Sequence, residues 1–232
     1  MPQTDELFHA GHRERLREKF LDKKITEAEQ LELLLGYAIP RRDVRPLARK
    51  LIQKFGSVYQ VIIAPMDELM AVPGVGRSVA ILIKLVCSLL TISHVHKLKY
   101  QSIFTNHQVV EDFCRMQMAN KATEEVHVLY LNGNFCLVDY EVHSQGGLTS
   151  SNIYFEKIMA RALKNGIKSL VLLHNHPTTD NTFSQEDVTL TEDFEKLLNM
   201  CNLTLYDHFV VSGGIVHSMR AENLLNKSIF KK

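Results

Sequence analysis

The chain has 232 residues, 45% of them hydrophobic, which is enough for one large or two small domains with a substantial core. We expect no segment to reach the ~20 apolar residues of a membrane span. Residues 1–6 lack the basic start and apolar middle of a signal peptide. The four cysteines form no Cys-x-x-Cys pair, as is typical of reduced thiols. These features exclude membrane-spanning and disulfide-rich secreted classes, so we expect a cytoplasmic protein without a membrane partner.

Charge is distributed unevenly along the chain. Residues 1–100 carry 16 Lys and Arg against 11 Asp and Glu, a formal balance of +5, which leaves −4 on residues 101–232. This asymmetry indicates two domains with different partners, the first of which would bind a polyanion. Ordinary scatter of surface charge explains the same numbers equally well.

The first hundred residues have helical periodicity. Thr26 and Glu29 have the spacing of a capping box ahead of an apolar run, and Gly56 ends a later apolar stripe. Beyond His94 the pattern loosens, which predicts a polar connection. Helical segments are predicted over residues 31–37, 47–55, 67–70, 78–90 and 109–118.

The second half alternates between strand and helix patterns. Asn132-Gly133-Asn134 is a hairpin signal between two strands, and Gly146-Gly147 breaks the second of them. The fold class is therefore α+β, with an all-α domain over 1–100, a connecting segment over 101–120 and an α/β mixed-sheet domain over 121–232. Strands are predicted over 126–130, 135–143, 169–174, 203–205, 209–212 and 215–218, and helices over 155–163 and 190–198.

The stretch from His174 to Asp187 has the pattern of a metal site. His174 and His176 follow a buried strand and, being two residues apart, point to the same side of an extended chain. Asp187 shares a helical face with Leu190, Thr191 and Phe194. Its carboxylate therefore points inward, where an unpaired charge would be costly. Two nitrogens, one oxygen and an open fourth position are typical of catalytic zinc.

A purely structural reading of these residues is also available. Ser184 and Asp187 fit a helix cap, and His174 fits a buried histidine whose ring bonds to backbone. The chain supplies a comparison in His94-Val95-His96, which has the same spacing without a preceding strand or a following acidic helix. We expect that second pair to lie on the surface or in a linker.

These segments resemble a known family. His174-Asn175-His176-Pro177, with Ser184 seven and Asp187 ten residues further on, resembles the JAMM (MPN+) metalloproteases, and most closely their RadC branch, formerly called a DNA repair protein. The segments 124–132, 184–191 and 207–211 resemble that branch as well, so the likeness covers nearly the whole chain. The resemblance implies one Zn2+ per chain, held by His174, His176 and Asp187 with a water in the fourth position.

The resemblance also implies catalytic roles. Ser184 would stabilise the oxyanion, and a glutamate before the first strand would serve as general base and then as acid. Glu124 matches the family position and Glu125 is the alternative, because adjacent strand residues face opposite sides. The chain departs from the family at Thr178, Thr179, Phe183 and Gly147, which puts the substrate in doubt but removes no presumed ligand.

Residues 69–80 resemble a helix-hairpin-helix motif. Gly74 and Gly76 would permit a tight turn with positive φ, and amides near Arg77 would then contact a phosphate. Such a contact predicts weak, sequence-independent and salt-sensitive DNA binding. A structural hairpin or a protein-docking module would need the same glycines. A basic face would be extended by five further arginines, Arg13, Arg15, Arg17, Arg41 and Arg42. The alternative is that these are ordinary solvated side chains.

Three functions follow from these patterns. The first is a zinc-dependent hydrolase of a peptide or isopeptide bond, fused to a DNA-binding helical module. The second is an enzyme that processes nucleic acid, which is disfavoured because a two-metal nuclease needs more carboxylates than the sequence places together. The third is a non-catalytic adaptor with a structural metal. The substrate and the oligomeric state are not determined by the sequence.

Overall fold

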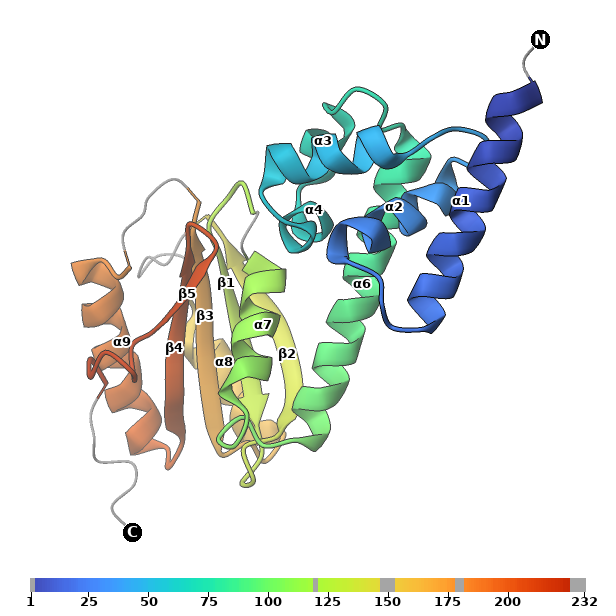
Figure 1. The fold of residues 1–232 in the computed structure, drawn as a ribbon. Helices are drawn as coiled ribbons and strands as arrows, with labels where there is room; N and C mark the ends of the chain where they lie inside the picture. The colour runs from blue at the N-terminus through green and yellow to red at the C-terminus, as the bar shows by residue number, and fades with distance from the viewer. Residues whose placement is uncertain (1–2, 119–120, 147–152, 178–181, 226–232) are drawn as a thin grey trace. The chain divides into compact units, whose positions relative to one another are not determined.

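The computed structural model describes residues 3–118, 121–146, 153–177 and 182–225. The chain forms two compact units, Met1–Leu89 and Leu90–Lys232, and the boundary falls within the long helix α6 (Arg77–Tyr100). The first unit is helical and the second is a five-stranded mixed sheet with helices on both faces (Figure 1). The predicted α+β class is therefore confirmed. Gly147, Thr178 and Thr179 lie outside the described residues.

The helical unit is built around an apolar core. Thr26 caps α2 with the predicted capping box, in which Thr26 Oγ1 accepts from the amide of Glu29 and the Glu29 carboxylate accepts from the amide of Thr26. Gly56, at φ +90°, ends α3 as expected. The helices are α1 (Gln3–Leu21), α2 (Glu27–Ala38), α3 (Arg45–Phe55), α4 (Val58–Ile63), α5 (Met66–Met70) and the start of α6. Leu35, Leu51 and Ile83 are among the fully buried residues of this core.

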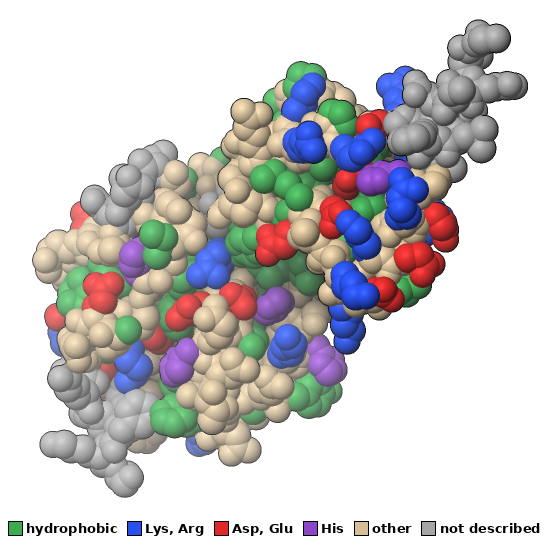
Figure 2. All heavy atoms as spheres, in the orientation of Figure 1, with side chains coloured by type: hydrophobic (Ala, Val, Ile, Leu, Met, Phe, Trp, Pro, Cys, Tyr) green, Lys and Arg blue, Asp and Glu red, His purple; other side chains and the backbone are tan. Residues whose placement is uncertain are grey.

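On the face seen in Figure 2, Lys and Arg side chains on the helical unit are interspersed with Asp and Glu. The field over this face is therefore of mixed sign, and the positive balance of the N-terminal residues is not gathered into one patch there. Long-range attraction of a polyanion to this face would be correspondingly modest.

Helix α6 is longer and more apolar than expected from the sequence. Among the described residues it alone has the length and composition of a membrane span, with a mean hydropathy of 2.0 over 18 residues, so the expectation that no segment has these properties was wrong. A core helix of a soluble protein passes the same test, but only 22% of this window is buried. Val79, Ala80 and Ile83 pack in the helical core, and Lys84 donates to the carbonyls of Ile63 and Ala64.

The sheet has the strand order β2-β1-β3-β4-β5. β3 and β4 are parallel, and the other neighbouring pairs are antiparallel. The strands are β1 (Glu125–Leu131), β2 (Leu137–Gln145), β3 (Ser169–His176), β4 (Thr204–Ser212) and β5 (Ile215–Ser218). The predicted hairpin joins β1 to β2, and the side chain of Asn132 accepts from the amides of Asn134 and Cys136.

Side-chain alternation gives the sheet two cores. The even-numbered residues of β1 and β3, such as Val128 and Leu172, face α8 (Phe155–Lys164) and α9 (Gln185–Met200). The odd-numbered residues, such as Leu129 and Val171, face α7 (His107–Met118). Because both faces of the sheet are covered, β1 and β3 are buried almost throughout. This alternation decides which polar side chains share a site.

Two element predictions were wrong. The polar connection expected after His94 is helical, because α6 continues to Tyr100 and buries Leu98 against the α7 face of the sheet. The two strands expected around Asp207 and His208 are one strand, β4. The polar pair broke the apolar pattern, yet both side chains are buried with hydrogen-bond partners, so the strand passes through them without interruption.

Candidate metal centre

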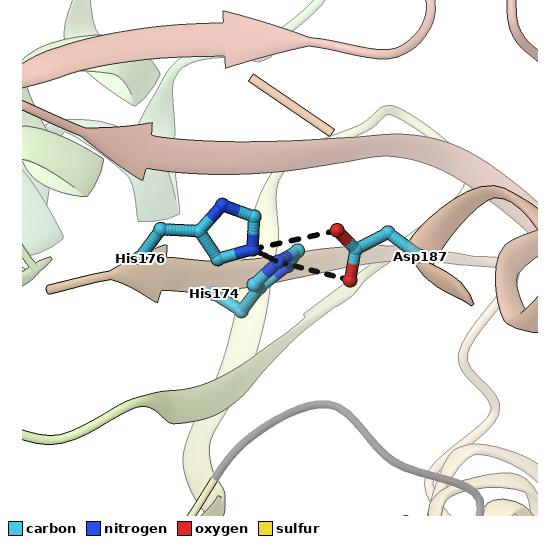
Figure 3. A group of neighbouring side chains, drawn as sticks. All are labelled: His174, His176 and Asp187. Atoms are coloured by element: carbon cyan, nitrogen blue, oxygen red, sulfur yellow. Dashed lines mark hydrogen bonds and ion pairs between the residues drawn. The ribbon is translucent and has the colours of Figure 1, made fainter. Parts of the chain in front are cut away.

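Strand β3 presents two imidazoles to the α9 face of the sheet. Because residues two apart point the same way in a strand, His174 and His176 both lie on this face, and the strand ends before Pro177. Asp187 approaches them from the first turn of α9 (Figure 3). His174 and Asp187 are 1% and 3% exposed, whereas His176 lies nearer the solvent.

The three side chains fit a tetrahedral metal. His174 Nε2 and His176 Nε2 are 3.0 Å apart, His174 Nε2 lies 3.3 Å from Asp187 Oδ1, and His176 Nε2 lies 3.4 Å from Asp187 Oδ2. A tetrahedron with metal–ligand bonds of about 2.0–2.1 Å has edges of about 3.3 Å. These separations are close to that edge, so the two imidazole nitrogens and one carboxylate oxygen of Asp187 could hold a metal ion.

A capping box positions the aspartate. Ser184 Oγ accepts from the amide of Asp187 at 3.1 Å, and Asp187 Oδ2 accepts from the amide of Ser184 at 2.7 Å. The purely structural reading of these two residues is therefore observed, and it is compatible with ligation. The cap uses Ser184 Oγ as an acceptor, so its hydroxyl hydrogen is still able to donate, and Ser184 is exposed at the surface.

The electrostatics of the cluster favour a charged Asp187 beside a neutral His174. Burial lowers the pKa of His174, and the Asp187 carboxylate only partly opposes that effect. Burial raises the pKa of Asp187, but the adjoining rings of His174 and His176 outweigh that effect and hold this pKa well below its usual range. Unprotonated imidazole and carboxylate are the forms that bind metals.

The register between β1 and β3 separates Glu124 from Glu125. Val126 pairs with His174 in the antiparallel ladder, so Glu124, two residues earlier, lies on the metal side. Its charge acts on His174, whose pKa it raises slightly. Glu125 faces α7 instead, where its carboxylate bonds to His127 at 2.8 Å and pairs with Lys121. The half-buried Glu124 is therefore the glutamate on the side of the metal ligands.

Comparison with known proteins identifies the family. Residues 104–224 match the RadC-like JAB domain. The chain belongs to the RadC-like JAB domain family. A UPF0758 protein of Rhodobacter capsulatus is 35% identical over 213 residues, covering 90% of this chain and 100% of the relative. UPF0758 proteins of Ruegeria pomeroyi and Fusobacterium nucleatum are 33% and 32% identical, covering 92% and 93% of this chain and 97% of each relative.

The JAB domain also contains two polar residues near the ligands whose roles the sequence analysis did not assign. His208 on β4 bonds to His174, and Thr191 on α9 bonds to His208. The segment 207–211 had been noted only for its resemblance to the RadC branch. The available signal was a polar histidine within an apolar strand pattern, but its use required knowing that β4 lies beside β3, the strand of His174 and His176.

The other candidate residues lie apart from this cluster. His94 and His96 lie on α6, and among the described residues only His174, His176 and Asp187 form a group suited to a metal. Gly74 has φ +103°, and a Cβ there would come within 3.3 Å of Leu47. Gly76 does not have the predicted positive φ, and a Cβ there would meet no atom within 4 Å. The structure thus requires glycine at Gly74 and not at Gly76.

Proposed function

We propose that this RadC-like JAB protein is a zinc-dependent hydrolase that cleaves a peptide or isopeptide bond in the cytoplasm. The observation that carries the proposal is the convergence of His174, His176 and Asp187, whose facing nitrogen and oxygen atoms lie 3.0–3.4 Å apart, close to the edge of a zinc tetrahedron. Glu124 and exposed Ser184 border the same side of the sheet. Three protein ligands with one open position are typical of catalytic zinc and not of structural zinc.

When bound, Zn2+ would supply Lewis-acid polarisation of a water molecule and of the scissile carbonyl. Glu124 would accept the proton that the water loses on attack. It would then deliver this proton to the leaving amine, so that a single carboxylate serves as base and then as acid. Its half-buried position supports this role, since partial burial limits competition from solvent while leaving the carboxylate accessible to substrate.

Ser184 would stabilise the developing oxyanion. Its Oγ accepts from the amide of Asp187, which fixes the side chain at the start of α9 and leaves the O–H to donate outward. The positive end of the α9 macrodipole lies at the same point and would favour the same negative charge. A preorganised donor of this kind contributes about 10²–10³-fold to a rate.

Two alternatives have weaker support. A two-metal nuclease would need a second set of ligands, and among the described residues only one group suited to a metal is present. A structural metal in an adaptor would not need a glutamate on the metal side, whereas the β1–β3 register puts Glu124 there.

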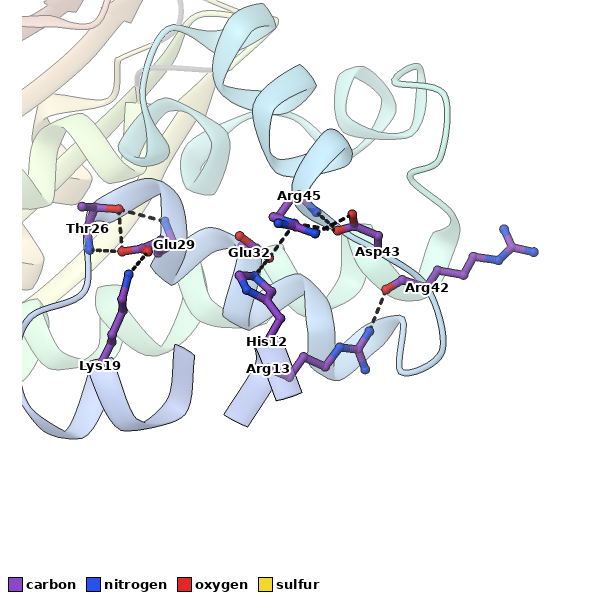
Figure 4. A network of polar contacts seen from close by, with 9 residues as sticks. All are labelled: His12, Arg13, Lys19, Thr26, Glu29, Glu32, Arg42, Asp43 and Arg45. Atoms are coloured by element: carbon purple, nitrogen blue, oxygen red, sulfur yellow. Dashed lines mark hydrogen bonds and ion pairs between the residues drawn. The ribbon is translucent and has the colours of Figure 1, made fainter. Parts of the chain in front are cut away.

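For the helical unit we propose weak, sequence-independent DNA binding. Arg77 is exposed at the first residue of α6, directly after the turn at Gly74. Other arginines are engaged in the fold. The guanidinium of Arg13 donates to the carbonyls of Ile39 and Pro40. It also donates to the carbonyl of Arg42, and Arg45 pairs with Asp43 (Figure 4). The donors of Arg13 are occupied by these carbonyls and the charge of Arg45 is offset by Asp43, which is consistent with low affinity for DNA.

The proposed hydrolase activity is tested by comparing substitutions at two neighbouring glutamates, Glu124 and Glu125. Peptide-linked, isopeptide-linked and nucleic-acid substrates are offered to the zinc-loaded protein and to its Glu124→Gln and Glu125→Gln variants. We expect cleavage of a peptide or isopeptide bond that falls about 10²–10⁴-fold in Glu124→Gln. Glu125→Gln should retain the rate because that side chain faces α7. DNA cleavage that survives Glu124→Gln would count against a peptidase, and equal losses in both variants would count against Glu124 as the base.

A further inference from the structure

We propose that His208 and Thr191 hold His174 in the tautomer with its proton on Nδ1, which leaves Nε2 unprotonated toward the metal. This inference rests on the proposed metal site but does not depend on which bond is cleaved. His208 and Thr191 are positioning residues, because they act through His174 and Asp187 and do not themselves belong to the ligand triangle.

The contacts form a closed loop between two ligands. His174 Nδ1 lies 2.7 Å from His208 Nε2, and His208 Nδ1 lies 2.7 Å from Thr191 Oγ1. Thr191 Oγ1 in turn donates to the backbone carbonyl of Asp187, one helical turn earlier in α9. All four residues are buried, and His208 is fully so. The loop therefore joins β3, β4 and α9 beneath the site.

The chemistry of the groups fixes the direction of each bond. His174 Nε2 faces His176 and Asp187, so it is the nitrogen that binds the metal and must be unprotonated. The proton of a neutral ring then sits on Nδ1 and is donated to His208 Nε2. His208 consequently carries its own proton on Nδ1 and donates it to Thr191, whose hydroxyl hydrogen goes to Asp187.

The reverse direction is incompatible with metal binding. If His208 donated from Nε2, then His174 Nδ1 would have to accept, and the proton of neutral His174 would sit on Nε2. A doubly protonated His208 would have the same consequence. Only one arrangement gives every donor an acceptor and leaves His174 Nε2 able to bind a cation.

The acceptor in this loop is unusual. Histidine ligands generally donate their second N–H to a carboxylate, a backbone carbonyl or water. The neutral imidazole of His208 orients the His174 ring without adding negative charge. Asp187 therefore supplies the only formal charge among the three proposed ligands, His208 and Thr191. The metal would keep more of its polarising power than it would beside a second carboxylate.

Matched variants distinguish an effect of the hydrogen-bonded loop on zinc binding from an effect of side-chain packing alone. Thr191→Val removes the hydroxyl and retains a β-branched side chain, whereas Thr191→Ser retains the hydroxyl. His208→Leu removes both ring nitrogens, whereas His208→Gln offers an acceptor to His174 and a donor to Thr191. Zn2+ affinity is measured by competition with a chelator, and the metal-free proteins are compared by thermal unfolding.

We expect Thr191→Val and His208→Leu to weaken zinc binding about 10–100-fold, with Thr191→Ser and His208→Gln recovering most of the loss. In zinc-loaded wild type, ¹H–¹⁵N spectra should place the ring protons of His174 and His208 on Nδ1. Unchanged zinc affinity in Thr191→Val and His208→Leu, or a proton on Nε2 of His208, would overturn the inference. A wild type that binds zinc but cleaves nothing would refute only the proposed activity, whereas one that binds no zinc would refute both.

Discussion

Replacing Asp187 by Asn tests the metal site through protein stability. Asp187 supplies the charged oxygen of the ligand triangle and is 3% exposed. Asparagine has nearly the same shape and can still accept from the amide of Ser184, so the start of α9 keeps that cap. The substitution removes the negative charge, and a neutral amide oxygen would be a weaker ligand for a zinc ion than a carboxylate.

The expected magnitude follows from mass action. Free zinc at 100 times its dissociation constant stabilises a folded protein that binds one ion by about 2.7 kcal/mol. The unit from Leu90 to Lys232 has the size at which 1 kcal/mol shifts the melting temperature by roughly 3–4 °C. Zinc should therefore raise the Tm of this unit by about 8–11 °C in wild type. At the same zinc concentration the shift should fall below about 2 °C in Asp187→Asn.

Calorimetry with chelator and with zinc measures these shifts. Glu186→Gln is the matched control, because it removes an exposed carboxylate from the same helical turn, and it should keep the full zinc shift. If Asp187→Asn kept the wild-type shift, then Asp187 would not be a ligand and the tetrahedral interpretation of the three side chains would be wrong. Equal losses in both variants would point to general electrostatic attraction.

Three further predictions concern other parts of the chain. Phe194 is fully buried and stacks on Phe155 at 4.3 Å, so Phe194→Ala should lower the free energy of unfolding by about 3–5 kcal/mol in denaturant titrations. Leu197→Ala, on the more exposed side of α9, should lower it far less. The hydrogen bond from Lys19, together with that from the Thr26 amide, lowers the pKa of Glu29 to about 2. This carboxylate therefore stabilises the fold at pH values above its unfolded pKa near 4.5, and the contribution is lost as the pH falls toward 2. Glu29→Gln should flatten the stability profile over that window, and an unaltered profile would exclude Glu29 as its source. Arg77→Gln should weaken DNA binding and reduce the salt slope by about 1, whereas Lys196→Gln on the other unit should change neither.

Much of the candidate site could be predicted from local patterns in the sequence. The alternation of His174 and His176 along a strand sets both rings on one side, and the helical period sets Asp187 inward. The capping spacing of Ser184 and Asp187 fixes the start of α9. These features depend on residues close together in the chain, so the sequence carries them without reference to the rest of the fold.

Other features depended on how distant segments pair. The choice between Glu124 and Glu125 follows from the antiparallel register of β1 with β3, because a shift of one residue would exchange their faces. His208 reaches His174 only because β4 lies parallel to β3.

The continuity of β4 was mispredicted because buried partners satisfy Asp207 and His208, which look like a break. The length of α6 was mispredicted because burial of Leu98 continues the helix through exposed polar residues. The sequence alone thus determined which side chains form the candidate metal site. Only the tertiary structure decided which side chains surround them, since strand pairing sets neighbours that local periodicity does not encode.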